Sequence, residues 1–433
     1  MTTPYRCARR DFLLAGFGAE LRAGSRHLET LRDWFHADAE ARQRGLQEKV
    51  ALIQTMDTTI RAWVQVSPQA PTGNGKLSGI PFGAKDIMET KGLSTAYGSP
   101  VYEGRLGKTD AAIVRDLRQR GAVLVGKTQT AAFAIRDPPP TRNPHNLQHT
   151  PGGSSSGSAA AVAAGMVPFA LGTQTAGSIL RPASYCGITG FKPTYGLFSL
   201  EGVLPYSKSC DTLGFFTHTP EDMLLLWQAL DRPSVPDEDF PVGVPDPLPE
   251  VEPEMKDAFE RAILALRSAG ISIQTVDIAA MLAKLVDAHN IISYYEGARF
   301  HRERFNEFGT RLGDGLVKLV REGLQISDSQ YKTAMDFISE FQERLSDLYE
   351  RTPVILVPAA TGPAPAGLSF TGDPRLNAPW TVVGTPAISI PMPIAEGLPL
   401  GLQLTADRHQ DASVLQTAIK VQRLLNSHHQ QQS

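Results

Sequence analysis

The chain carries the stretches PGGSSSG at residues 151–157 and GTQTAGSILRP at residues 172–182, joined by an alanine-rich segment. Over residues 151–196, nine of the 46 positions are glycine, about twice the average of the whole chain. Glycine at this density lets two backbone segments, or a backbone and a ligand, approach closely. A flexible linker is the alternative for the first stretch, but a linker seldom runs directly into a small-residue helix and a second Gly-Ser turn. We therefore expect two close-packed turns that flank a helix over Ala159–Gly165.

The residues around these turns alternate between helical and strand-like patterns. A helical pattern over Asp110–Arg120 ends at Gly121, as at a C-cap glycine, and the apolar run Ala122–Val125 follows as a buried strand. Further runs have the length and β-branching of strands: 271–276, 354–357, 387–391 and 400–405. Because helices alternate with these strands, we expect an α/β fold with helices on both sides of a central sheet.

Two helical regions lie outside this core pattern. Residues from about 10 to 65 are polar on the outside, and their apolar residues recur at spacings of three and four, which marks one buried helix face: Leu46, Val50, Ile53, Met56, Ile60 and Trp63. We expect residues 1–65 to form an N-terminal helical arm packed on the core, and residues 66–430 to form a single domain. A helical stretch at about 281–346 is interpreted as an insertion that caps a site.

The composition is that of an ordinary globular protein. Of 433 residues, 42% are hydrophobic and 20% are charged, and the net charge is −3. Without a basic block, neither nucleic acid nor an anionic membrane is expected as a partner. No run of about 18 apolar residues predicts a membrane span. The three cysteines give no disulfide framework and no metal-ligand spacing, and we expect neither a metal nor a cofactor.

The N-terminal sequence leaves two interpretations of location open. Arg9-Arg10 and the apolar residues after it look like a twin-arginine export signal. Such a signal needs an apolar region of roughly 7–15 residues, and Glu20 and Arg22 interrupt the one found here. We expect a cytoplasmic protein.

Residues 121–128, GAVLVGKT, match the Walker A pattern of nucleotide-binding loops letter for letter. A Walker loop needs open backbone N–H groups and a strand before it. Here the residues between Gly121 and Gly126 are themselves strand formers, and the segment before Gly121 is helical. We expect these residues to form a sheet strand and to bind no nucleotide.

Residues 153–157, GSSSG, also fit the G-x-S-x-G nucleophile elbow of α/β-hydrolases. The elbow requires a strand immediately before its serine, and an acid and a histidine downstream. Residues 143–151 have the composition of a loop, and no histidine stands out by position. These observations disfavour the elbow.

Together, the two turns resemble the signature of the amidase signature family. The family pattern is G-G-S-S-S-G, a gap, and then G-T-x-T-x-G-S-I-x-R-P-A. GIPFGAKD at 79–86 looks like the family's lysine-bearing strand, and GFKPTYG at 190–196 and DTLG at 211–214 also fit. The match is close over residues 79–214 and looser over most of the chain. It implies the family's fold, a central mixed sheet sandwiched by helices, and a serine hydrolase that cleaves a small amide-like bond.

The resemblance carries over to individual residues. Ser178 matches the nucleophile that becomes acylated, Ser154 matches the bridging serine at a cis peptide bond, and Lys85 matches the base. The ordinary pKa of lysine is about 10.4, so burial beside the apolar run Ile80–Ala84 would have to lower the pKa of this base. The oxyanion hole is expected to consist of four backbone N–H groups: those of Thr175, Ala176, Gly177 and Ser178.

Two departures from the common pattern resemble the malonamidase branch of the family. Gln174 stands where many members have aspartate. Leu180 stands where many have arginine, and the arginine comes one place later, at Arg181. Arg136-Asp137-Pro138 also has a counterpart in that branch. Arg181 could grip a substrate carboxylate or pin a loop, and both roles stay open. We predict Arg181, Ser155 and Gln174 as substrate-binding residues.

Other functions of the same residues are also considered. An amidotransferase subunit that strips ammonia from glutamine would share the triad, but it resembles longer chains with the usual aspartate and arginine, so Gln174 and Leu180 argue against it. Ester or carbamate cleavage stays open, because the triad does not fix the leaving group. An inactive binding scaffold is disfavoured because all three triad positions are present. The expected partner is a small-molecule amide, and a homodimer stays open.

Overall fold

A single mixed β-sheet forms the centre of the molecule. The computed structural model describes residues 27–236, 238 and 241–432; the arginine pair near the N-terminus and Cys7 lie outside the described residues. Within them the sheet has eleven strands, in the order β1-β3-β2-β4-β6-β5-β10-β11-β9-β7-β8. The strands are β1 (Trp63–Gln69), β2 (Pro81–Lys85), β3 (Val123–Thr128), β4 (Phe169–Gln174), β5 (Thr189–Lys192), β6 (Thr212–Thr217), β7 (Val242–Pro245), β8 (Ile273–Val276), β9 (Val354–Pro358), β10 (Ala387–Pro391) and β11 (Gly401–Ala406). Strand β2 runs parallel to β3 and β4, and β7 runs parallel to β8 and β9, whereas the other pairs are antiparallel.

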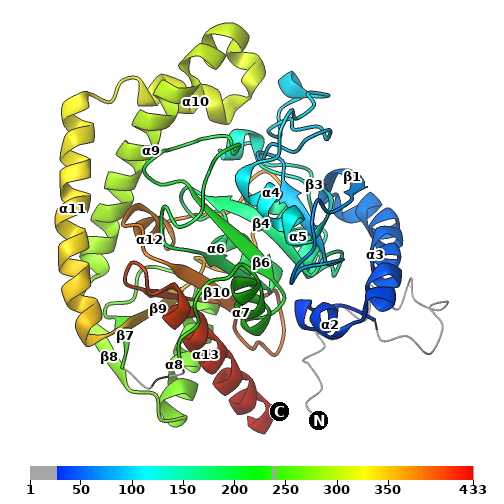
Figure 1. Cartoon of the computed structure of the whole chain (residues 1–433). Helices are drawn as coiled ribbons and strands as arrows, with labels where there is room; N and C mark the ends of the chain where they lie inside the picture. Colours follow the sequence, from blue (N-terminus) through cyan, green and yellow to red (C-terminus); the bar gives the residue numbers. More distant parts are fainter. Residues whose placement is uncertain (1–26, 237, 239–240, 433) are drawn as a thin grey trace.

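Helices cover both faces of this sheet (Figure 1). They are α2 (Leu31–His36), α3 (Ala39–Ile60), α4 (Ala112–Gln119), α5 (Ser156–Ala163), α6 (Leu180–Cys186), α7 (Pro220–Ala229), α8 (Pro253–Ser268), α9 (Ala279–Phe308), α10 (Asp314–Gly323), α11 (Asp328–Arg351), α12 (Ala378–Val382) and α13 (Asp411–Gln432), with short 3-10 turns η1 (Pro100–Tyr102), η2 (Ala132–Ala134) and η3 (Gly309–Leu312). Alternation along β4 sends Phe169 and Leu171 into the hydrophobic cluster under α4, α7, α8 and α13, and sends Ala170 into the cluster under α3, α5 and α6. The predicted α/β sandwich with a central mixed sheet is confirmed.

Helix α5 lies unusually close to the sheet because its residues are small. All eight of its residues are buried. A Cβ atom at Gly157 would lie 2.1 Å from the backbone oxygen of Ala62 and 2.3 Å from the backbone nitrogen of Gln129. Only glycine at position 157 lets α5 approach the backbone of Ala62 and Gln129 so closely. This contact fixes the start of α5, just after the first serine turn.

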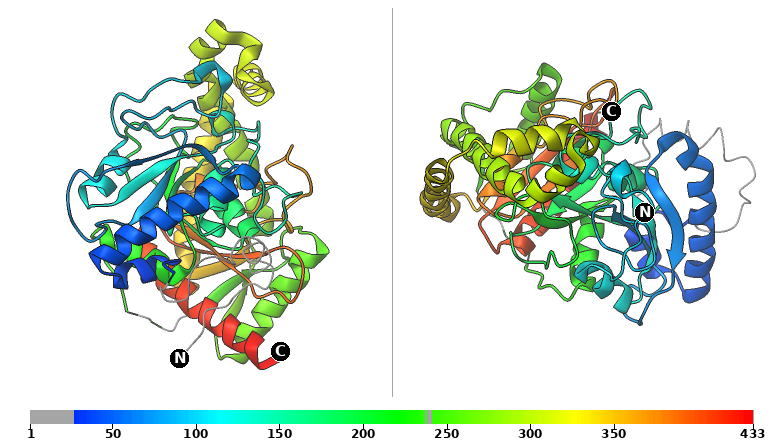
Figure 2. Two further views of the ribbon diagram at one scale, coloured as in Figure 1. Left: turned by 90° about the vertical axis from the view of Figure 1, so that its right-hand side faces the viewer. Right: turned by 90° about the horizontal axis from the view of Figure 1, so that it is seen from above.

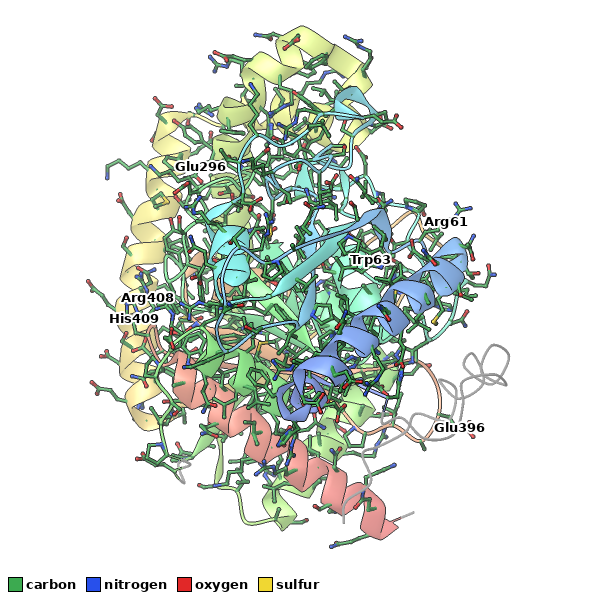
Figure 3. All side chains as sticks on the ribbon, turned by 45° about the vertical axis from the view of Figure 1, so that its right-hand side comes forward. Arg61, Trp63, Glu296, Glu396, Arg408 and His409 are labelled. Atoms are coloured by element: carbon green, nitrogen blue, oxygen red, sulfur yellow. The ribbon has the colours of Figure 1, made fainter. Side chains whose placement is uncertain are left out.

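The first described helices, α2 and α3, bury Leu31, Trp34, Ile53 and Ile60, and α3 ends before the boundary expected at residue 65. Ile53 and Ile60 are buried on the apolar face of α3. Figure 2 shows α3 and β1 side by side. The prediction for Trp63 is wrong: the helix stops at Arg61, whose φ is 55°, and Trp63 begins β1 (Figure 3). The side chain of Asp57 accepts hydrogen bonds from the backbone of the next turn, 2.6 Å from the nitrogen of Ala62, and so supports the change of direction. The expected boundary at residue 65 therefore falls inside a strand of the sheet.

Helices α9, α10 and α11 form the helical region predicted at 281–346, and the region is slightly longer than expected. Figure 1 shows them along one side of the sheet. The apolar faces of α9 and α11 bury a separate cluster against β9 and α12 that includes Leu285, Ile338 and Trp380. The buried residues Leu316, Leu319 and Val320 of α10 belong to the main hydrophobic cluster instead. None of the helices in the described part of the chain is long and apolar enough to cross a membrane.

The Walker-like residues form part of the sheet, as predicted. Residues 123–128 are β3, which pairs with β1 on one side and β2 on the other. Lys127 is fully buried, with Nζ 3.1 Å from Oδ1 of Asp86 and 2.7 Å from Oγ1 of Thr95. The elbow interpretation also lacks its strand, because residues 143–153 form turns and isolated bridges before the serine turn.

Candidate active site

Lys85 lies at the end of β2, a strand buried along its whole length between β3 and β4. Its Nζ atom is 2.7 Å from Oγ of Ser154, 2.8 Å from Oγ1 of Thr173 and 3.5 Å from the backbone oxygen of Thr173. Burial lowers the pKa of Lys85 to about 7, while the carboxylate of Asp211 acts to raise it. A lysine that acts as a base near neutral pH needs a lowered pKa, and Lys85 has one at this buried position.

Ser154 lies in the first turn, directly before α5. The peptide bond between Gly153 and Ser154 is cis, as the family resemblance implied. A Cβ atom at Gly153 would lie 2.8 Å from Cγ2 of Thr371 and 2.9 Å from Oγ of Ser156, so a glycine is needed before the serine. The backbone oxygen of Ser154 accepts a hydrogen bond of 3.0 Å from the nitrogen of Ala131. These contacts fix the serine over the amine of Lys85.

Ser178 lies in the second turn, between β4 and α6. Its side chain is 8% exposed, and its hydroxyl forms no hydrogen bond with any residue that the structure describes. The turn is joined to the first one by Arg181, whose Nη2 atom is 2.7 Å from the backbone oxygen of Gly153. The structure thus brings Lys85 and Ser154 into direct contact and places Ser178 in the neighbouring turn with its hydroxyl free to react.

In the second turn, the described residues engage the backbone oxygens of residues 175–177 but not the N–H groups of residues 176–178. The oxygen of Thr175 accepts a hydrogen bond from Nε2 of His289 (2.8 Å), that of Ala176 from Oγ1 of Thr381 (2.8 Å), and that of Gly177 from the nitrogen of Arg181 (3.1 Å). In a trans peptide unit the N–H group points opposite to the C=O group. The N–H groups of residues 176–178 therefore point away from these partners, and no hydrogen bond engages them within the described residues. Such free donors can stabilise an oxyanion.

Arg181 is buried in α6 and is held by two of its three guanidinium nitrogens. Nε is 2.7 Å from the backbone oxygen of Thr371, and Nη2 contacts Gly153. Nη1 is buried without a hydrogen-bond partner, and it would be 3.1 Å from a Cβ atom at Gly177. Burial lowers the pKa of Arg181 from its ordinary value. This residue therefore pins two loops and still carries one unused donor beside the second turn.

Gln174 and Ser155 do not face the site in the way predicted. The Gln174 side-chain oxygen accepts hydrogen bonds from the backbone nitrogens of Ile179 and Leu180, and its nitrogen donates to Thr381. Ser155 donates to the backbone oxygen of Thr173 at 3.2 Å. Both side chains are fully buried and engaged by the chain itself, so their structural role is to hold the two turns rather than to contact a substrate.

Three residues at the site were not predicted: Thr173, Asp211 and His289. Thr173 lies within the stretch 172–182, and Asp211 lies within the DTLG motif, so their positions could have been found from the sequence, although their roles could not. His289 is 114 residues from the oxygen it contacts, and no local pattern indicates that contact. No group of three or more His, Cys, Asp or Glu side chains that could hold a metal ion occurs in the described residues.

The chain is similar to known proteins over most of its length. The Amidase family model matches residues 41–415. A glutamyl-tRNA(Gln) amidotransferase subunit of Bacillus velezensis is 31% identical over 87% of this chain and 90% of its own, and that of Alkaliphilus metalliredigens is 33% identical over 79% and 82%. A crystal structure of an amidase covers 92% of this chain and 100% of its own with a TM-score of 0.82 at 26% identity. The crystal structure of the corresponding amidotransferase subunit of Thermotoga maritima covers 89% and 92% with a TM-score of 0.78 at 27% identity.

Proposed function

The chain belongs to the amidase family, whose members act on carbon–nitrogen bonds other than peptide bonds, and from this premise we propose that it hydrolyses a small amide through an acyl-enzyme on Ser178. Ser154 and Lys85 complete the triad. The observation that carries this proposal is the contact of 2.7 Å between Nζ of a buried lysine and Oγ of Ser154.

The proposed reaction runs in two halves. Oγ of Ser178 bonds to the substrate carbonyl carbon while its proton passes to Ser154 and the proton of Ser154 passes to neutral Lys85. The oxyanion that forms faces the N–H groups of residues 176–178. The C–N bond then breaks, and the leaving amine takes the proton back from Lys85 through Ser154. Water repeats the sequence on the acyl-enzyme and releases the acid.

The surroundings of Lys85 orient its lone pair. A neutral amine has two N–H donors and one lone pair. Thr173 offers two acceptors, its hydroxyl oxygen at 2.8 Å and its backbone oxygen at 3.5 Å. When both N–H groups are directed at Thr173, the lone pair faces the hydroxyl of Ser154. This arrangement supports the assignment of Lys85 as the base that accepts the proton.

We further propose that the substrate carries a carboxylate bound by Arg181, as in the malonamidase branch that the sequence resembles. The support is the unused Nη1 atom of Arg181, buried beside Gly177 in the turn that holds the nucleophile. A buried donor without a partner is costly, and a substrate carboxylate would satisfy it with a charge-assisted hydrogen bond. The other two nitrogens stay bound to Thr371 and Gly153, so Arg181 would act both as a support and as an anchor.

A panel of malonamate-like, neutral aliphatic and aryl amides, with an ester and a carbamate, tests the proposal. Intact mass should show an acyl group on the wild type, and Ser178→Ala should show neither acylation nor hydrolysis. Undiminished labelling of Ser178→Ala by a serine-reactive probe would assign the nucleophile elsewhere. If the enzyme prefers the ester or the carbamate over every amide, the proposed substrate class changes from an amide to that compound class.

Arg181 needs a test that separates its two roles. Because it pins Thr371 and Gly153, Arg181→Leu should lower the melting temperature and damage every substrate. Arg181→Lys keeps the positive charge but loses the planar guanidinium group with its several N–H donors. The measurement that separates the two roles is therefore the ratio of kcat/KM for an acidic amide to that for a neutral amide of equal length. Loss of a charge-assisted contact of about 1.5–3 kcal/mol lowers this ratio roughly 10- to 150-fold. An unchanged ratio would end the carboxylate hypothesis.

The second candidate function is that of an amidotransferase component, favoured by the similarity to the Bacillus and Alkaliphilus amidotransferase proteins. Against it stand Gln174 and Leu180, which depart from the usual aspartate and arginine. Free glutamine belongs in the substrate panel for this reason. Glutamine hydrolysis that is absent from the purified chain and appears with co-purifying proteins would favour this candidate.

We place either activity in the cytoplasm, supported by the free and buried Cys186 and Cys210.

A further inference from the structure

A buried carboxylate lies beneath the second serine turn. Asp211 precedes β6 and is 7% exposed. Its Oδ1 atom accepts a hydrogen bond of 2.5 Å from Oγ1 of Thr175, and its Oδ2 atom accepts hydrogen bonds from the backbone nitrogens of Tyr206 (2.7 Å) and Ser207 (3.0 Å). Both oxygens of the carboxylate are thus engaged, and one of them holds the first residue of the turn.

Thr175 is held at both of its polar ends. Asp211 binds its hydroxyl, and Nε2 of His289 on α9 donates to its backbone oxygen at 2.8 Å. Because the oxygen of Thr175 is fixed, the plane of the next peptide unit is fixed, and with it the direction of the N–H group of Ala176. The geometry of the oxyanion donors therefore depends on the residues that hold Thr175.

The support of Thr175 extends to the helical insertion. Glu296 on α9, labelled in Figure 3, accepts hydrogen bonds from the hydroxyls of Ser207 (2.7 Å) and Ser209 (2.5 Å) and from the nitrogen of Ser209 (2.9 Å). It also accepts one from Oη of Tyr331 on α11 (2.7 Å). The loop that carries Asp211 is therefore clamped to α9 and α11, and this clamp limits the movement of the carboxylate.

We propose that Asp211 is a positioning residue of the amide hydrolysis: it fixes the oxyanion donors through Thr175, and its negative charge acts on Lys85. This inference rests on the function proposed above. A negative charge near a buried amine favours the protonated form, so the carboxylate opposes the effect of burial on the base. Asp211 would thereby set both the geometry of the site and the pH at which its base becomes neutral.

The charges around Asp211 agree with this role. Burial raises the pKa of Asp211 to about 6, against the hydrogen bonds from Thr175, Tyr206 and Ser207 that lower it, so the group is ionised where Lys85 loses its proton. The titratable groups that face it come from several elements: Lys85 on β2, Glu296 on α9, and Tyr195, Tyr206 and Cys210 on the loops beside it. Burial raises the pKa of both tyrosines and of the thiol, which keeps these three groups neutral near pH 7.

Two variants separate the two effects. Asp211→Asn removes the charge and keeps the shape, so the pH midpoint of kcat/KM should move to lower pH, because Lys85 loses a neighbouring anion. Thr175→Val removes the hydroxyl that holds the turn, so kcat at high pH should fall about 100-fold through misplaced donors. The midpoint should move less than in Asp211→Asn, because the variant loses one hydrogen bond that lowers the pKa of Asp211 but keeps the carboxylate. Asp222→Asn, another buried aspartate that accepts a backbone N–H group, serves as the control with wild-type kinetics.

The outcomes distinguish this inference from the function on which it rests. If Asp211→Asn folds and keeps the wild-type midpoint, Asp211 does not act on the base and the inference is wrong. If Thr175→Val has the kcat of the wild type and Asp211→Asn loses only melting temperature, the carboxylate is merely structural and the inference is again wrong. A wild type that neither hydrolyses any amide nor labels at Ser178 with a serine-reactive probe would overturn the proposed function first, and the inference with it. Should Asp211→Asn fail to fold, Thr175→Val alone decides, because the positioning role requires its loss of kcat.

Discussion

At the scale of single residues, the amine of Lys85 lies among hydroxyl and carbonyl oxygens of Ser154 and Thr173. These groups solvate an ammonium ion less well than water does, and the result is a pKa of about 7 instead of the ordinary 10.5, with burial as the cause. A base must be neutral to accept a proton. The same burial that costs stability therefore makes Lys85 reactive near neutral pH.

The pH dependence of the rate follows from this pKa. Below pH 7 Lys85 is mostly protonated and cannot accept the proton of Ser154, so kcat/KM should rise with pH through about 7 and level off above it. Initial rates on one amide from pH 5 to pH 9, with buffer controls, measure the midpoint. A rate that falls over this range, with chemistry shown to limit turnover, would exclude Lys85 as the base.

Replacement of Lys85 should separate activity from stability. Lys85→Met should lose several orders of magnitude in kcat, because no other base contacts Ser154 in the described residues. The folded state depresses the pKa of this lysine, so its burial costs free energy that grows as pH falls from about 10.5 to about 7 and stays constant below, up to a few kcal/mol. The melting temperature of Lys85→Met relative to the wild type should therefore increase as the pH falls through this range.

Lys192 provides a matched control for this prediction. It is equally buried, and burial lowers its pKa to about 7, but its Nζ atom donates to the backbone oxygens of Pro193 and Thr385, outside the triad. Lys192→Met should show a similar pH dependence of stability and keep the wild-type kcat. If Lys85→Met gains no stability toward lower pH while Lys192→Met does, the lowered pKa of Lys85 is wrong.

At the scale of secondary-structure elements, β3 shows how a motif can match in letters and differ in structure. The backbone of β3 is paired on both sides, so its N–H groups cannot cradle a phosphate. Lys127 points instead to Asp86, in an ion pair that is buried completely. Burial lowers the pKa of Lys127, and the charge of Asp86 acts to raise it. Lys127 therefore supports the chain at Asp86, directly after Lys85 at the end of β2.

We predict that the protein does not bind ATP and that Lys127 contributes to stability. Lys127→Met leaves Asp86 buried without its cation and should destabilise the fold by about 3–5 kcal/mol. The double variant Asp86→Asn with Lys127→Met should recover much of this loss, because no uncompensated charge remains. Denaturation of both variants and titration of the wild type with ATP measure these effects. Saturable ATP binding that disappears in Lys127→Met would contradict the sheet interpretation.

The same elements show what the sequence could and could not predict. Length and β-branching were sufficient for the strands at 354–357 and 387–391, because those residues are buried almost from end to end. Trp63 was misassigned because a spacing of three continues past Ile60 although Arg61 turns the chain. Local pattern also cannot give the order of strands, such as β10 between β5 and β11, because pairing joins residues far apart in the chain.

The site residues show the same difference between what local sequence motifs predict and what depends on contacts between distant parts of the chain. Short motifs predict Lys85, Ser154 and Ser178 as a triad; the structure brings Lys85 and Ser154 into contact, and the catalytic roles stay a proposal. Gln174 is predicted to bind substrate, whereas in the structure its amide oxygen holds the start of α6. His289 could not be predicted at all, since its contact with Thr175 exists only after α9 packs beside the sheet.

At the scale of the whole molecule, the first described helices are joined to the core by a buried carboxylate. The backbone nitrogen of Arg32 in α2 donates to Oδ1 of Asp222 in α7 at 2.8 Å. Leu31 and Trp34 of the same helix are buried in the main hydrophobic cluster. Burial raises the pKa of Asp222 to about 7, against the hydrogen bonds from Arg32 and Thr219 that lower it. The docking of the N-terminal helices is therefore linked to pH.

The sign of this linkage gives the last prediction. An aspartate whose folded pKa is raised contributes stability that is present below its unfolded value of about 3.8 and is lost as the pH rises through about 7. Asp222→Asn keeps an acceptor for Arg32 but carries no charge, so it should remove this loss. Its melting temperature relative to the wild type should rise between pH 4 and pH 7 and stay level above, a gain of up to a few kcal/mol in the free energy of unfolding. Melting curves at intervals of half a pH unit measure the difference, and amide exchange at Arg32 shows whether α2 stays docked. A difference that does not change with pH would mean that Asp222 is ionised in the folded protein throughout this range, and that the α2 contact is not linked to its protonation.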